Sequence, residues 1–287
     1  MFKVAILGCE NSHATHFMRH VLTNHAITDM EFVGVYSYDR AAAEKLHDEF
    51  GVYVADSYDE FVGKVDGIVI TARHGGNHYK YAKPYIESGI PMFVDKPITK
   101  TEEEAREFMA DLKAHNIKMC GGTSCIFSKR IQTLKKAVQE QTFGKTVGGY
   151  LRGPVYLNSP FDGFFFYSQH VTQSAMEIFG YYPDSVYATR KGDNLTAILH
   201  YNGFDVNLNF RGDTSLYYAL VSGTNMVVGD RFDCGAHYGD EFNEFYEILK
   251  GGEMTKSYED IFAPVYVLNA MYRSMESGKE EKVNYNM

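Results

Sequence analysis

The chain has 287 residues, of which 28 are basic and 37 acidic, so its formal net charge is −9. This length accommodates one large domain or two ordinary ones. Apolar residues make up 45% and charged residues 23%, which is typical of a globular protein and excludes a disordered or fibrous one. The negative charge argues against a nucleic-acid partner, because such proteins need a basic surface to displace counterions. No apolar run is long enough to cross a membrane and no signal-peptide pattern is present, so we expect a cytoplasmic protein.

The first part of the chain alternates between short apolar runs and amphipathic stretches. Strands are predicted at residues 2–7, 32–36, 52–55, 67–71, 91–94 and 117–120, and helices at 13–22, 41–50, 77–87 and 101–112. Thr101 and Glu104 have the spacing of a capping box. Strands that alternate with helices in this way form a parallel sheet covered on both faces. We therefore predict a doubly wound α/β domain of the Rossmann type over residues 1–120.

The pattern changes after Gly121-Gly122. Alternating apolar residues on either side of Asn202-Gly203 predict an antiparallel hairpin over 196–211, because this dipeptide favours a two-residue turn. A helix at 131–139, a strand at 146–152, and helices at 240–251 (capped by Asp240) and 257–278 complete the prediction. Residues 121–287 thus form an α+β domain with an open, mostly antiparallel sheet.

Four cysteines occur in the chain, Cys9, Cys120, Cys125 and Cys234. They are too few for a disulfide framework, and none has the spacing of a zinc site or a C-x-x-C motif. We predict buried free thiols and no metal site. The histidines His13, His16 and His20 recur at helical spacing, which is more often a solvated helix face than a set of metal ligands.

The turn after the first strand, residues 8–14, is where a dinucleotide fold places its glycine-rich phosphate loop. Gly8 fits the first glycine, but Glu10 replaces the second, and a carboxylate there would repel phosphate. Asn11 and Ser12 are good helix caps, and the amides behind them, including that of His13, still offer an anion site.

The second strand is followed by Ser37, Asp39 and Arg40, at the position where a dinucleotide fold contacts the adenosine ribose. Ser37 and Arg40 together would accept the 2′-phosphate of NADP. Asp39 would instead bind the 2′-hydroxyl of NAD, or simply cap the next helix. We favour binding that tolerates NADP.

Two further strands end in polar residues, at Thr71-Ala72 with His78 nearby, and at Val94-Asp95-Lys96-Pro97. Ligands of open α/β sheets bind at such strand ends. Lys96 precedes a proline and is therefore held in extended backbone. A lysine there, beside Asp95, can orient a substrate hydroxyl and stabilise developing negative charge on its oxygen.

Together these segments resemble the glucose–fructose oxidoreductase and inositol dehydrogenase family, known as Gfo/Idh/MocA. Residues 66–72 and 94–97 look like its strand ends, Asp95-Lys96-Pro97 looks like its Glu-Lys-Pro motif, and residues 143–147 look like the entry to its second domain. The resemblance implies that NAD or NADP binds at Gly8, Asn11, Ser12, His13, Ser37, Asp39, Arg40, Thr71, Ala72, His78, Asp95 and Lys96.

The resemblance also implies a catalytic histidine. The family carries it in an Asp-x-x-x-His helix, and His170 aligns with that histidine, whereas Phe166 replaces the aspartate. Tyr167 or Gln173 is then expected to set the tautomer of His170. Histidine suits proton transfer because its ordinary pKa lies near neutrality.

The implied activity is NAD(P)-dependent oxidation or reduction of a secondary alcohol of a sugar, cyclitol or related polyol. His170 would remove the hydroxyl proton and Lys96 would position the oxygen. Two alternatives remain: glycoside cleavage or elimination assisted by NAD without net redox change, and a non-catalytic family member with a degraded cofactor site, for which Glu10 and Phe166 are the arguments. The resemblance further implies that residues 121–287 bind substrate and mediate oligomerisation. In this family the open sheet usually makes the dimer contact, so we expect a homodimer or homotetramer.

Overall fold

The computed structural model describes all 287 residues, which form two compact units. The first unit comprises residues 1–122 and 238–261, and the second comprises 123–237 and 262–287. The sequence predicts a single division after residue 120. In the structure the chain also comes back to the first unit at residues 238–261. None of the helices combines the length and the apolarity that crossing a bilayer requires.

The first unit is built on a five-stranded sheet in the order β2-β1-β3-β4-β5, with every pair parallel. Its strands are β1 (Phe2–Leu7), β2 (Met30–Tyr36), β3 (Gly67–Ile70), β4 (Met92–Asp95) and β5 (Met119–Gly122). The Rossmann-type sheet is therefore confirmed. The strand expected at 52–55 is wrong, because this segment meets the edge strand β2 only at an isolated bridge between Val54 and Val35.

The helices of this unit are α1 (Ser12–Met18) with a π-helical continuation (Arg19–Thr23), α2 (Arg40–Phe50), α3 (His78–Ala82) flanked by 3₁₀ turns (Gly75–Asn77 and Lys83–Ser88), and α4 (Glu102–Ala114). The helix expected at 77–87 is thus interrupted. Its last part tightens at Pro84, which has no backbone N–H for an α-helical bond. The capping box of Thr101 and Glu104 is confirmed at the start of α4.

Helix α7 (Tyr238–Leu249) belongs to the first unit and begins two residues before the expected cap, Asp240. Its Phe242 packs against Phe17 of α1, with ring centroids 4.9 Å apart. The histidines of α1 and its continuation also face this helix: His16 stacks on Tyr238 at 4.2 Å. The expectation of a solvated histidine face was therefore wrong, because that face is covered by a helix distant in the sequence.

The second unit is built on a seven-stranded sheet in the order β11-β10-β6-β9-β8-β7-β12. Its strands are β6 (Thr146–Pro154), β7 (Ser185–Lys191), β8 (Asn194–Tyr201), β9 (Phe204–Arg211), β10 (Tyr217–Gly223), β11 (Val227–Phe232) and β12 (Glu281–Lys282). Only the β6–β9 pair is parallel, so the mostly antiparallel sheet is confirmed. The predicted hairpin is β8–β9, and Gly203 has the positive φ (93°) that its turn needs.

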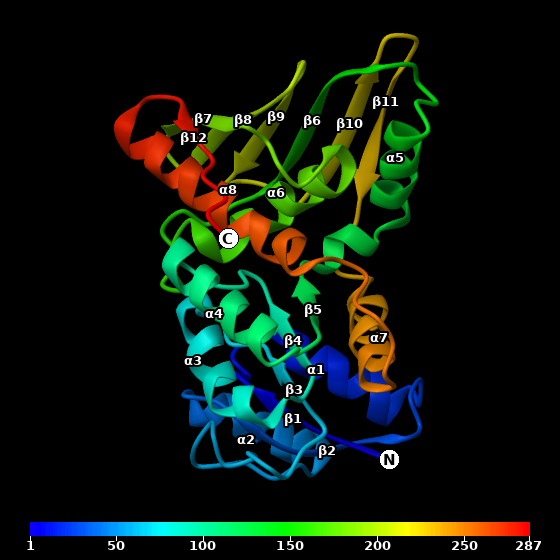
Figure 1. Cartoon of the computed structure of the whole chain (residues 1–287), viewed down its shortest axis with the longest axis vertical. Coiled ribbons are helices and arrows are strands. Elements are labelled where there is room, and N and C mark those ends of the chain that lie inside the picture. Colours follow the sequence, from blue (N-terminus) through cyan, green and yellow to red (C-terminus); the bar gives the residue numbers. More distant parts are fainter. The chain divides into compact units, whose positions relative to one another are not determined.

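Helices cover one face of this sheet. They are α5 (Lys129–Gln139), α6 (Phe165–Phe179) and the larger part of α8 (Tyr258–Ser277), as Figure 1 shows. The 3₁₀ turn η4 (Ser124–Phe127) packs against α5 and α6. Apolar residues of β8 such as Leu195 and Leu199 are fully buried, whereas Thr196 between them is exposed. The sheet thus has one covered and one open face, which the alternating pattern predicts.

Candidate functional site

In the first unit, the turn after β1 approaches the end of β3 closely. Gly8 has a φ of 91°, and a Cβ on it would overlap the backbone of Ala72, so only glycine fits. The Thr71 hydroxyl donates a hydrogen bond to the Gly8 carbonyl. Asn11 caps α1 by accepting a hydrogen bond from the His13 amide at 2.7 Å. The structure therefore brings these predicted residues together at the carboxyl ends of the strands.

Glu10 does not lie against the amides of this turn. The Ser37 hydroxyl donates a hydrogen bond to one of its carboxylate oxygens, and the Arg73 amide donates to the other at 3.1 Å. Ser37, which directly follows β2, is nearly buried. The Glu10 carboxylate thus lies at the end of β2, where a dinucleotide fold carries the acid that reads the ribose.

The other predicted ribose contacts are arranged differently. Asp39 precedes α2, but its side chain makes no capping hydrogen bond. Arg40 is exposed and pairs with Asp56 at 2.6 Å and with Glu44 at 3.3 Å. The positive charge that a 2′-phosphate would need is therefore already shared between two carboxylates.

Asp95 is the centre of a buried polar cluster at the end of β4. Asn11 Nδ2 donates a hydrogen bond to its Oδ2 at 2.9 Å, His13 Nδ1 lies 3.0 Å from the same oxygen, and the Lys96 amide donates to Oδ1 at 2.7 Å. Burial alone would raise the pKa of Asp95, but the charges of His13 and Lys96 and the hydrogen bond from His13 hold that pKa well below its ordinary value. Asp95 is therefore a carboxylate that fixes the glycine turn to the end of β4.

Lys96 follows directly and is only 4% exposed. Burial lowers the pKa of its amino group, against the opposing charges of Asp95 and Glu241. A lysine with a lowered pKa is typical of sites where protons or developing charge are handled.

His78 has a different environment from the one expected of a cofactor contact. Its ring is fully buried, with Nε2 2.8 Å from the Ala72 carbonyl and Nδ1 3.3 Å from the Ile98 carbonyl. Both ring nitrogens thus face the backbone of the segments that follow β3 and β4. This arrangement suits a residue that positions those two segments.

Glu241 is a functional candidate that the sequence analysis missed. It lies in the first turn of α7, is 1% exposed, and neither carboxyl oxygen has a hydrogen-bond partner. Burial raises its pKa well above the ordinary value, and the negative charges of Asp95 and Glu244 add to this effect, whereas Lys96 opposes it. Sequence alone gives no signal for it, because an acid in a first helical turn is also typical of a solvated helix start.

We expect the Glu241→Gln substitution to stabilise the protein by about 1–3 kcal/mol at pH 8 and by much less at pH 5. The unfolded chain releases the glutamate proton above a pH of about 4.5, whereas the raised pKa makes the folded chain hold it to higher pH. The destabilisation therefore grows as pH rises from the unfolded pKa toward the folded one. Urea unfolding at both pH values measures the difference. Glu247→Gln, at an exposed position of the same helix, is the control. An equal effect of Glu241→Gln at both pH values would contradict the expectation.

The second unit holds His170, on α6, which is 5% exposed. Its Nδ1 lies 2.6 Å from the Thr123 hydroxyl and 3.5 Å from Cys125 Sγ. Because a hydroxyl can donate or accept, Thr123 supports either neutral tautomer of the ring. Thr123 thus lies where a tautomer-setting partner is needed, and no motif around it predicts this role.

The two residues expected to orient His170 behave differently. The Gln173 Oε1 accepts hydrogen bonds from the Thr123 amide at 3.1 Å and from Gln169 Nε2 at 2.8 Å. Tyr167 packs its ring edge-on to that of His170 at 4.7 Å. Gln173 therefore supports the imidazole indirectly, by holding the backbone of Thr123.

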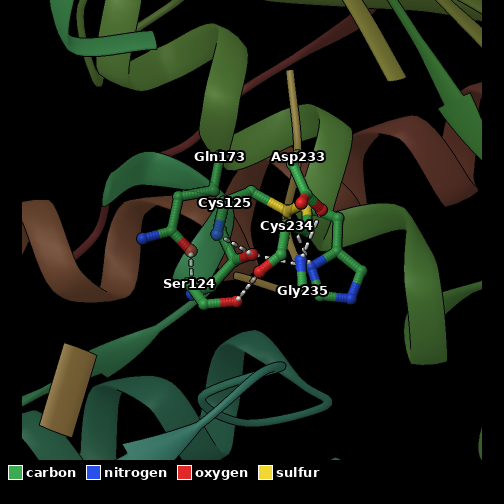
Figure 2. The surroundings of a disulfide bond; sticks show 8 residues. Ser124, Cys125, Gln173, Asp233, Cys234 and Gly235 are labelled. Atoms are coloured by element: carbon green, nitrogen blue, oxygen red, sulfur yellow. Dashed lines mark hydrogen bonds between the residues drawn. A yellow bond between two sulfur atoms is a disulfide. The ribbon is translucent and has the colours of Figure 1, made fainter. Parts of the chain in front are cut away.

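The prediction of four free cysteines was wrong for two of them. Cys125 and Cys234 form a disulfide, shown in Figure 2, whereas Cys9 and Cys120 are buried free thiols. The Ser124 hydroxyl, next to Cys125, donates a hydrogen bond to the Cys234 carbonyl at 3.0 Å. A separation of 109 residues hides this proximity from any reading of cysteine spacing.

Comparison with known proteins agrees with this geometry. Residues 2–121 match a family described as the Gfo/Idh/MocA oxidoreductase family, NAD-binding Rossmann fold, which confirms the resemblance seen in the motifs. An uncharacterized oxidoreductase, YhhX, of Escherichia coli (strain K12) is 28% identical over 97 residues, which span 33% of this chain and 28% of YhhX.

Solved structures match over nearly the whole chain. GenD2 from gentamicin A biosynthesis, in complex with NAD, has a TM-score of 0.86 at 16% identity and covers 99% of this chain and 96% of its own. The myo-inositol 2-dehydrogenase of Lactobacillus plantarum has a TM-score of 0.86 at 17% identity, with 99% of both chains covered. A putative myo-inositol dehydrogenase of Sinorhizobium meliloti 1021 has a TM-score of 0.83 at 19% identity, covering 99% of this chain and 100% of its own. These likenesses show a shared fold.

Proposed function

We propose that this chain, whose residues 2–121 match the NAD-binding Rossmann fold of the Gfo/Idh/MocA oxidoreductase family, is a dehydrogenase that oxidises a secondary alcohol of a sugar, cyclitol or related polyol. The observation that supports this most is the buried Asp95–Lys96 pair, held against the glycine turn at the end of β4. The inositol dehydrogenases among the structural matches support the substrate class.

In the proposed mechanism the nicotinamide, when bound, supplies the redox chemistry. Lys96 donates a hydrogen bond to the substrate oxygen and stabilises the negative charge that develops there. His170 accepts the hydroxyl proton, and the Thr123 hydroxyl holds its Nδ1, which leaves the other ring nitrogen to take that proton. Asp95 keeps Lys96 and the Gly8 turn in place through Asn11 and His13.

The position of Glu10 favours NAD over NADP. Its carboxylate, bound by Ser37 and the Arg73 amide, is placed to accept a hydrogen bond from a ribose hydroxyl and to repel a 2′-phosphate. Arg40, the residue expected to attract that phosphate, is paired with Asp56 and Glu44. This arrangement replaces the NADP tolerance expected from the sequence with a proposed preference for NAD.

Titration with NADH and with NADPH tests the cofactor site directly. We expect NADH to bind at micromolar concentration and NADPH at least about tenfold more weakly, since a like-charge contact costs on the order of 1.4 kcal/mol or more. Glu10→Gln should bring the dissociation constants of NADH and NADPH closer together. Glu49→Gln, at an exposed position of α2, should leave their ratio unchanged. The chain has no tryptophan, so nicotinamide fluorescence is excited without a competing donor.

The same titration separates the proposal from its alternatives. Absence of binding at millimolar concentration of either dinucleotide would overturn the dehydrogenase and favour a non-catalytic member of the family. With binding established, a screen of polyols should give NADH in proportion to the product formed. Product formed with only trace cofactor would instead indicate cleavage or elimination without net redox change.

The open face of the second unit's sheet supports a homodimer or homotetramer. Neighbouring strands align a row of half-buried or exposed residues across this face: Leu220, Tyr150, Asn207, Ile198 and Tyr187. Aromatic and aliphatic side chains in such a row are typical of subunit interfaces. We also propose the cytoplasm as its location.

A further inference from the structure

We propose that Cys125, Cys234 and His170 form a binding site for a zinc-class divalent ion once the Cys125–Cys234 disulfide is reduced. The two sulfurs and an imidazole nitrogen lie within 4.8 Å of one another, and all three side chains are buried. Cys125 comes from η4, His170 from α6, and Cys234 from the segment after β11. The fold of the second unit, rather than any local motif, therefore assembles these ligands.

The donor set matches the chemistry of zinc. Two thiolates and one imidazole are the ligands of one type of catalytic zinc site, which keeps its fourth position for water or substrate. Once the sulfur–sulfur bond is broken, each Sγ can rotate about its Cα–Cβ bond, and the sulfurs can separate to accept an ion between them. The metal would then replace the Thr123 hydroxyl, which now lies 2.6 Å from Nδ1.

The surroundings hold the ligand backbones firmly. The Thr123 side chain accepts a hydrogen bond from the Cys125 amide at 3.2 Å, and the Ser124 hydroxyl fixes the Cys234 carbonyl. Just after Cys234, the Gly235 amide donates to Asp233 at 2.8 Å, as the turn in Figure 2 shows. Such supporting hydrogen bonds pre-organise a metal site.

The two states are related by a balanced exchange. A dithiol reductant supplies two electrons and two protons, so that the disulfide becomes two thiols and the reductant becomes a disulfide. Metal binding then displaces both thiol protons. Clustered cysteines in a reducing compartment are more often metal ligands or redox groups than structural disulfides, so reduction would make both thiols available to a metal ion.

Metal binding would also inhibit the proposed oxidation of the alcohol. An ion on Nδ1 takes that lone pair and leaves the ring proton on Nε2, so His170 could no longer accept a proton from substrate. This consequence, unlike the site itself, rests on the proposed function. We therefore expect zinc to inhibit the reduced enzyme and a chelator to restore it.

Cobalt substitution tests the site without any activity assay. The full-length protein is reduced with a phosphine, which is then removed, and is titrated with Co²⁺ under anaerobic conditions. We expect one Co²⁺ per chain, with thiolate-to-cobalt charge-transfer absorption that Zn²⁺ abolishes. The unreduced protein should show none of this absorption. Cys125→Ser and Cys234→Ser should each lose most of it, whereas Cys120→Ser, which removes a buried free thiol, should retain it.

Two results would overturn the site: no stoichiometric cobalt absorption in the reduced protein, or the same absorption in both serine variants. If circular dichroism shows that either variant fails to fold, the reduced wild-type protein is tested by thiol alkylation instead. Bound Zn²⁺ should then protect two thiols from alkylation, and lack of protection would count against the site. If the protein shows the cobalt absorption but binds no dinucleotide, the metal site is supported and the proposed dehydrogenase activity is overturned.

Discussion

Replacement of Lys96 with methionine is expected to lower kcat by about 10³-fold, within the range for loss of a group that handles developing charge. Methionine keeps most of the buried side-chain volume but removes the ammonium group that contacts the substrate oxygen in the proposed mechanism. Binding of NADH should change little, because the Asp95 contacts to Asn11 and His13 remain. Steady-state turnover of a polyol and nicotinamide fluorescence measure the two effects separately.

The control is Lys45→Met, at an exposed position of α2, which should keep full activity. Because burial lowers the pKa of Lys96, turnover of the wild-type enzyme should decline on the alkaline side at a pH below that of an ordinary lysine. An active Lys96→Met variant, or an unchanged alkaline limb in it, would remove Lys96 from the mechanism.

His170→Asn is expected to reduce kcat by about 10²–10⁴-fold, the usual contribution of a general base. Thr123→Val should reduce it by about tenfold, because the imidazole remains but loses the hydroxyl that holds its Nδ1. The assay is run with a chelator and with the disulfide intact, so that metal binding does not contribute. A kcat of Thr123→Val between those of the wild type and His170→Asn, with KM nearly unchanged, is the expected pattern.

Thr133→Val, which removes an exposed hydroxyl from α5, controls for the chemical change itself and should leave kcat at the wild-type value. If Thr123→Val also retained wild-type turnover, the threonine would have no positioning role. If His170→Asn retained it, another group would have to accept the proton.

Most of the first unit was predictable because its strands are buried on both faces and read as continuous apolar runs, such as Ile68 to Ile70. Local signals also sufficed for the hairpin at Asn202-Gly203 and for the capping box at Thr101. The position of α7 was not predictable. Its amphipathic pattern shows that one face is buried but not which unit buries it.

The site divides in the same way. Gly8, Asp95 and Lys96 were found because they follow strands, and parallel strands bring their ends to one edge. Thr123, Glu241 and the cysteine pair were missed because each depends on contacts between distant segments. The negative charge of Glu10 was visible in the sequence. The position of its carboxylate was not, because it depends on the hydrogen bonds from Ser37 and the Arg73 amide.

The return of residues 238–261 to the first unit affects how this protein is made. During translation, residues 1–122 leave the ribosome without the helix that covers Phe17 and Phe93. Synthesis of residues 123–237 then takes on the order of ten seconds before α7 can dock. The nascent first unit therefore exposes an apolar face during that interval, and chaperones that recognise apolar segments would find their binding site there.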